Sequence, residues 1–117
     1  MKKILVVEDD TSIRELLVEI FEIEGYEVHS SSNGLEGIYS LEKQIPDVIL
    51  MDIFMPIMDG FAFRKEQMGN PAWNLIPTVA MSAQNQKEEE LMTLGLTNFI
   101  SKPLELDHLL ATIRSLT

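Results

Sequence analysis

Cysteine is absent from this sequence of 117 residues, so the chain forms neither disulfide bonds nor thiolate metal sites. No apolar run approaches the ~20 residues that a membrane-spanning helix requires. The apolar stretch 4–7 near the start is followed at once by Glu8, Asp9 and Asp10, which is not the pattern of a secretory signal peptide. We therefore expect a cytoplasmic protein that has no contact with a membrane.

Basic residues are also scarce. Nine Lys and Arg residues stand against 19 Asp and Glu residues, which gives a net charge of -10. Nucleic acids are bound through basic surfaces, so we expect no nucleic-acid binding by this chain alone. The acidic residues could serve solubility, or some of them could gather around a cation, and only their positions can decide. The length corresponds to one domain, which we assign to residues 1–117.

Two periodicities alternate along the chain. Short runs of largely apolar residues predict five strands, at 4–7, 27–30, 47–51, 77–81 and 97–101. Between them, apolar residues recur at helical spacing, as at Ile13, Leu16, Leu17, Ile20 and Phe21. Five strands that alternate with helices indicate the α/β class, with a doubly wound parallel sheet. The second strand is the least apolar of the five, so we place it at an edge.

Some helix ends have their own signals. Ser12 and Glu15 have the spacing of a capping box at the start of the first helix, and Gly25 stands where that helix would end. Asp59 is interpreted as the cap of a third helix at 59–68, without a chemical role. A short charged helix is predicted at 87–94, ending at Gly95.

Chemically useful side chains follow the central strands. Glu8 and Asp9 end the first strand, Asp52 the third, Ser82 the fourth and Lys102 the fifth. In parallel α/β sheets the carboxyl ends of the strands form the ligand-binding edge, so these side chains should meet there.

Three neighbouring carboxylates need a counter-charge, because like charges raise one another's pKa values. An all-oxygen ligand set suits Mg²⁺. A site that combines a cation, a lysine, a hydroxyl and an aspartate nucleophile is suited to accepting a phosphoryl group.

Several segments carry a resemblance to a known family. They are 4–10 (ILVVEDD), 46–52 (PDVILMD), 55–60 (MPIMDG), 77–83 (PTVAMSA) and 102–103 (KP). In this order and spacing they resemble the signatures of the receiver domains of two-component systems, over essentially the whole chain. The resemblance implies a stand-alone response-regulator receiver domain. It also implies a flavodoxin-like fold with five parallel strands in the order 2-1-3-4-5.

The resemblance further implies roles for single residues around a bound Mg²⁺. Asp52 would be the phosphoacceptor. Asp9, Asp52 and the backbone carbonyl of Phe54 would bind Mg²⁺ directly, while Glu8 would act mainly through water. Lys102 would contact a phosphoryl oxygen.

Two further residues would form the switch. Ser82, helped by the backbone amide of Ala83, would bind the phosphoryl group and reorient on phosphorylation. The ring of Phe99 would then turn inward. A cis peptide bond before Pro103 would direct Lys102 into the site.

The function implied is that of a phosphorylation switch rather than a turnover enzyme. A histidine kinase or a histidine phosphotransfer protein would supply the phosphoryl group. The surface of the fourth helix, fifth strand and fifth helix would then change for a downstream protein target. The domain would be a monomer or a weak, phosphorylation-dependent dimer. We also hypothesise that the bulky Phe54 hinders the attacking water and prolongs the life of the aspartyl phosphate.

Three other functions compete. A phosphohydrolase with an aspartate nucleophile usually has a second acid two residues later, where this chain has Phe54. A flavodoxin-like electron carrier needs a Ser/Thr/Gly-rich phosphate loop after the first strand, where this chain has three acids. A pseudo-receiver that only binds partners would not need the full set of acids with Ser82 and Lys102.

Overall fold

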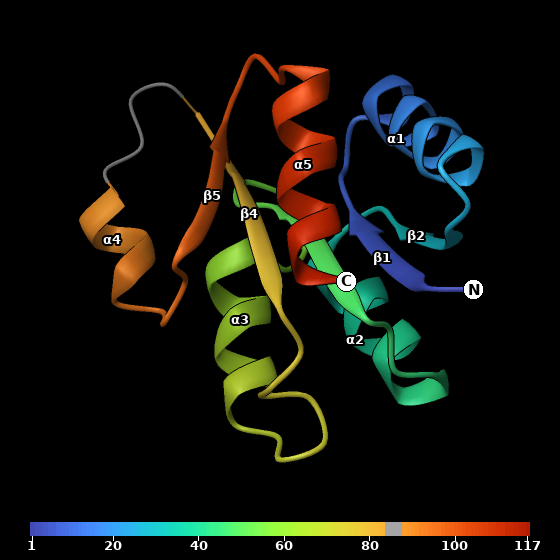
Figure 1. Ribbon diagram of the computed structural model, residues 1–117. Coiled ribbons are helices and arrows are strands. Elements are labelled where there is room, and N and C mark those ends of the chain that lie inside the picture. Colours follow the sequence, from blue (N-terminus) through green and yellow to red (C-terminus); the bar gives the residue numbers. More distant parts are fainter. Residues whose placement is uncertain (84–87) are drawn as a thin grey trace.

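The computed structural model describes residues 1–83 and 88–117, without the side chain of Glu88. Five parallel strands form one sheet in the order β2-β1-β3-β4-β5 (Figure 1). The strands are β1 (Lys3–Val7), β2 (Glu27–Ser31), β3 (Val48–Asp52), β4 (Thr78–Ser82) and β5 (Asn98–Ser101). The helices are α1 (Thr11–Ile23), α2 (Gly34–Lys43), α3 (Gly60–Met68), α4 (Glu88–Met92) and α5 (Leu106–Leu116). The predicted doubly wound sheet, its flavodoxin-like strand order and the edge position of β2 are confirmed.

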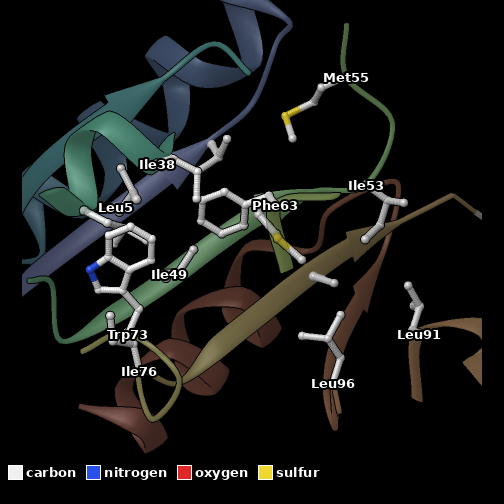
Figure 2. Close-up of a cluster of buried hydrophobic side chains, with 14 residues drawn as sticks. Leu5, Ile38, Ile49, Ile53, Met55, Phe63, Trp73, Ile76, Leu91 and Leu96 are labelled. Atoms are coloured by element: carbon white, nitrogen blue, oxygen red, sulfur yellow. The ribbon is translucent and has the colours of Figure 1, made fainter. Parts of the chain in front are cut away.

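The helices cover both faces of the sheet, which explains why the central strands are apolar along their whole length. On one face, α1 and α5 pack on alternate strand residues such as Ile4, Leu50 and Met81. On the other face, α2, α3 and α4 bury a second cluster (Figure 2). Figure 2 shows Phe63 of α3 at the centre of that cluster, with Leu91 and Leu96 at one end.

The start of α1 differs from our prediction. Asp10 is the N-cap, and its side chain accepts a hydrogen bond of 3.0 Å from the backbone N–H of Ile13. The helix begins at Thr11, so Ser12 lies inside the first turn and the predicted capping box of Ser12 and Glu15 is wrong. Aspartate is as good a cap as serine, and β1 ends close enough to the helix for Asp10 to take that position.

Other local predictions are confirmed. Gly25 has a φ of +93°, a left-handed conformation that glycine adopts without strain, and α1 ends just before it. Asp59 caps α3 by accepting a hydrogen bond of 2.9 Å from the N–H of Ala62. Within the predicted helix at 87–94, Glu88–Met92 is helical, while Lys87 lies outside the described residues.

Three methionines and the tryptophan serve packing. Met51 and Met81 are fully buried in the strands, and Met55 and Trp73 belong to the core cluster of Figure 2. Within residues 1–83 and 88–117, we find no helix with the length and apolar character needed to cross a bilayer.

Candidate functional site

The carboxyl ends of four strands meet at one edge of the sheet. Asp52 and Ser82 are the last residues of β3 and β4, and β3 and β4 pair directly in register. Glu8 follows β1, and Lys102 follows β5. The parallel ladders keep these strand ends level, so residues far apart in the sequence are brought together. The predicted convergence of these side chains is therefore a property of the fold.

Glu8, Asp9 and Asp52 form an acidic cluster. One carboxylate oxygen of each lies within 4.8 Å of the others. Glu8 is completely buried, Asp52 is 8% exposed and Asp9 is exposed to solvent. The cluster therefore has two buried acids at its base and one acid at its mouth.

Lys102 connects the two buried acids. Its Nζ lies 3.1 Å from Oδ2 of Asp52 and 3.2 Å from Oε1 of Glu8. The backbone positions the side chain, because the N–H of Lys102 donates to the carbonyl of Ser82 at 2.8 Å. The bond between Lys102 and Pro103 is cis, as the resemblance implied. One ammonium group is thus shared between the two carboxylates.

The close contact of these charged groups shifts the pKa values of Glu8 and Lys102. Burial and the neighbouring Asp52 carboxylate raise the pKa of Glu8 to about 7, although Lys102 acts against the shift. For Lys102, burial disfavours the charged form, but the hydrogen bonds and charges of Asp52 and Glu8 outweigh it and raise the pKa. The site therefore has more negative charge than one lysine balances.

A divalent cation fits this set of donors. Its possible ligands are carboxylate oxygens on adjacent strand ends, close enough together to bind one ion. Mg²⁺ prefers oxygen ligands and commonly takes only one or two carboxylates while it keeps several waters. Since Asp9 faces solvent, such an ion could retain part of its water shell at the mouth of the cluster.

The other predicted residues differ in burial. Ser82 is buried at the end of β4. Phe99 of β5 is half-buried and packs against the core cluster of Figure 2. The ring of Phe54 is 59% exposed and meets the ring of Phe61 edge to face, with the centroids 6.3 Å apart. Phe54 therefore presents an apolar side chain to solvent two residues after Asp52. His29 and His108 lie on β2 and α5, outside the acidic cluster.

Sequence reasoning missed Arg14. Its guanidinium donates hydrogen bonds to the backbone carbonyls of Glu8, at 2.8 Å, and Asp9, at 3.3 Å. It thereby holds the turn that carries both acids. The only signal in the sequence is an arginine in the first turn after the acids, which is too common to predict this contact.

A model of the response regulator receiver domain matches residues 4–114. The chain belongs to this family. Receiver domains are signalling modules of two-component systems rather than turnover enzymes, and they bind Mg²⁺ in an acidic pocket.

Relatives and solved structures agree with this assignment. The receiver domain is 33% identical to the polar-differentiation response regulator DivK of Brucella anthropi, over 97% of this chain and 94% of that protein. It spans only 24% and 26% of the length of two longer regulators that it also matches, AtoC of Escherichia coli and PleD of Caulobacter vibrioides.

Among solved structures, the chemotaxis response regulator CheY4 of Vibrio cholerae superposes with a TM-score of 0.91 and 29% identity, covering 100% of this chain and 99% of that one. The receiver domain of the Pseudomonas aeruginosa sensor histidine kinase PA1611 has a TM-score of 0.86 and 27% identity, covering 98% and 93%. That structure is described with a magnesium ion coordinated in its active site cleft.

Proposed function

We propose that Asp52 accepts a phosphoryl group from the phosphohistidine of a histidine kinase or a histidine phosphotransfer protein. The observation that carries this proposal is the shared contact of Lys102 with Asp52 and Glu8, at 3.1 and 3.2 Å. It puts a cation beside a nearly buried carboxylate at an edge that solvent can reach through Asp9. In this arrangement residues 1–117 act as one receiver domain in the cytoplasm.

The transfer forms one bond and breaks one bond. A carboxylate oxygen of Asp52 attacks phosphorus, the P–N bond of phosphohistidine breaks, and the electron pair of that bond returns to the imidazole nitrogen. Lys102 neutralises charge on the phosphoryl oxygens, and the hydroxyl of Ser82 and the amide of Ala83 donate to them. The domain thus promotes its own phosphorylation, and later its own dephosphorylation, without turning over a substrate.

Asp9, Asp52 and the backbone carbonyl of Phe54 would hold Mg²⁺, with Glu8 acting through water. The ion supplies positive charge for the phosphoryl oxygens when it is bound. Glu8 and Asp52 are both nearly buried, so the added charge also offsets their mutual repulsion.

Phosphorylation would then be transmitted to a protein partner. Ser82 moves toward the phosphoryl group, and Phe99 turns into the space that the hydroxyl leaves. Because Phe99 lies on β5, this changes the surface formed by α4, β5 and α5, which we propose as the binding face for a downstream protein target. The domain is a monomer or a weak dimer that phosphorylation favours, and it binds no nucleic acid by itself.

Incubation with Mg²⁺ and acetyl phosphate, followed by intact mass measurement, tests this function. We expect one phosphoryl adduct in the native protein and none in Asp52→Asn. Asp59→Asn is a matched control, since asparagine caps a helix as well as aspartate does and the adduct should persist. An adduct that survives in Asp52→Asn, or no adduct in the native protein, would falsify the proposal.

A further inference from the structure

A buried polar network joins α3 to β4 and takes no part in the proposed phosphoryl chemistry. Arg64 and Gln67 of α3 and Thr78 of β4 are 7%, 0% and 5% exposed. Nη1 of Arg64 donates to Oε1 of Gln67 at 2.8 Å and to Oγ1 of Thr78 at 3.2 Å. Gln67 in turn donates to the backbone carbonyls of Trp73 and Ile76. These contacts hold the guanidinium of Arg64 against α3 and β4.

The other two nitrogens of the Arg64 guanidinium, Nε and Nη2, contact the turn that follows α4. Nε of Arg64 donates to the carbonyl of Leu94 at 3.0 Å, and Nη2 donates to the carbonyl of Gly95 at 3.3 Å. Burial lowers the pKa of Arg64, as expected for a cation taken out of water. All four acceptors named here are uncharged, so the arginine is held by dipoles rather than by an ion pair.

Those two carbonyls follow Met92, the last residue of α4, in the turn that ends the helix. The N–H of Gly95 donates to the carbonyl of Met92 and the N–H of Leu96 donates to the carbonyl of Leu91, with Gly95 at a φ of +72°. These two bonds form a Schellman end, which satisfies the carbonyls of Leu91 and Met92. Arg64 satisfies the later carbonyls of Leu94 and Gly95. A positive group at a helix C-terminus also interacts favourably with the helix dipole. Arg64 of α3 therefore binds the turn that ends α4.

The other end of α3 rests on the phosphoacceptor. The N–H of Gly60 donates to the carbonyl of Ile53 at 2.6 Å. A Cβ atom at Gly60 would stand only 2.7 Å from the backbone oxygen of Asp52, so the approach tolerates no side chain. One helix thus contacts the backbone of Asp52 at its start and the end of α4 in its second turn.

We propose that Arg64 is a positioning residue that ties the C-terminal end of α4 to α3, so that phosphorylation of Asp52 shifts the beginning of α4 relative to a fixed end. This inference rests on the proposed function for the phosphorylation step. The anchoring itself does not depend on it. The buried side chain of Leu91 supports the same end from the core, whereas Met92 is 59% exposed.

Hydrogen exchange at single amides tests the anchoring in the unphosphorylated protein. Arg64→Met keeps an unbranched apolar side chain but removes the guanidinium and all its donors. The amides of Leu94, Gly95 and Leu96 should then exchange about tenfold faster or more, while β1 and β3 keep their protection. Arg64→Lys keeps the charge without the planar fork and should give a smaller increase. Arg114→Met, which removes an exposed arginine paired with Glu24, should leave these amides unchanged.

Exchange after treatment with Mg²⁺ and acetyl phosphate tests the fixed end. In the native protein, phosphorylation should alter exchange at the beginning of α4 and leave residues 94–96 unchanged. In Arg64→Met, residues 94–96 should also respond, although Asp52 is phosphorylated at the native rate. A residue with only a structural role would not create this new dependence.

Three results would overturn the inference. They are unchanged exchange at residues 94–96 in Arg64→Met, an equal increase across the whole domain in both Arg64 variants, and a native protein in which both ends of α4 respond equally. A native protein that forms no phosphoryl adduct would refute the proposed function and the phosphorylation-linked shift with it. The exchange of the unphosphorylated variants would still show whether Arg64 anchors α4.

Discussion

Nζ of Lys102 lies 3.1 Å from a carboxylate oxygen of Asp52, although 50 residues separate the two in the sequence. The same nitrogen contacts Glu8, which is fully buried. Lys102 is therefore the cation on which both inner acids of the site depend. Its side chain is 30% exposed, so it can also reach a group that enters from solvent.

Replacing Lys102 should impair phosphorylation. Lys102→Met removes the charge that neutralises the phosphoryl oxygens, and we expect acetyl phosphate to react at least ~10-fold more slowly at saturating Mg²⁺. Intact mass recorded over time gives the rate. The exposed Lys65 provides a matched control, and Lys65→Met should react at the native rate. A native rate in Lys102→Met would remove this residue from the mechanism.

Magnesium should stabilise the folded domain. A ligand that binds only the native state at about 100 times its Kd adds ~2.7 kcal/mol to the free energy of unfolding. Thermal unfolding with MgCl2, compared with NaCl of the same ionic strength, should show a higher Tm. The increase should shrink in Asp9→Asn and persist in Asp107→Asn, whose aspartate lies in the first turn of α5. Equal increases in all three proteins would argue against a site at the acidic cluster.

The lifetime of the phosphorylated state should depend on Phe54. Its exposed apolar side chain follows Asp52 by two residues and packs against the ring of Phe61, and we expect it to hinder the approach of water to the phosphoryl group. Phe54→Asn should shorten the half-life of the adduct, while Phe54→Leu, which keeps the apolar bulk, should change it less. The hypothesis fails when the native half-life equals or falls below that of Phe54→Asn.

Ile57 should limit the stability of the domain. It is a β-branched residue with a φ of +70°, in a tight turn closed by the N–H of Met58 and the carbonyl of Pro56 at 2.7 Å. Its side chain is 79% exposed, so little packing compensates the strain. Ile57→Gly should raise the free energy of unfolding by about 0.5–1 kcal/mol in urea denaturation. Ile57→Ala keeps the strained conformation and should not reproduce the gain.

Glu36 should give the domain a pH-dependent increment of stability. The backbone N–H of Ser32 donates to its carboxylate at 2.9 Å, and this bond lowers the pKa of Glu36. A carboxyl whose pKa is lower in the folded state stabilises the protein above its unfolded pKa and loses that effect as the pH falls through the folded pKa. Glu36→Gln should therefore be less stable than the native protein at pH 7, by about 0.5 kcal/mol for an exposed group. The difference should shrink as the pH falls through the folded-state pKa of Glu36 and vanish below it in denaturation curves. A difference that does not change with pH would contradict the assignment.

Local patterns were sufficient for most of the fold. Strands buried on both faces must be apolar throughout, and helices that pack on a sheet must be apolar on one side. Both kinds of element can therefore be predicted from the local sequence without knowing what packs against them. The start of α1 was mispredicted because Asp10 and Ser12 are both good caps. The choice between them depended on where β1 ends in space.

The candidate site also has features that the sequence predicts and features that depend on tertiary packing. That Glu8, Asp9, Asp52, Ser82 and Lys102 gather at one edge follows from the sequence alone, because parallel strands align their carboxyl ends. The tertiary structure alone decided that Glu8 is buried, with a pKa near 7, and that Lys102 is shared between two acids. It also decided that Arg64 binds the turn that ends α4. Burial and side-chain contacts across 30 or more residues depend on how the elements pack, and no local period encodes them.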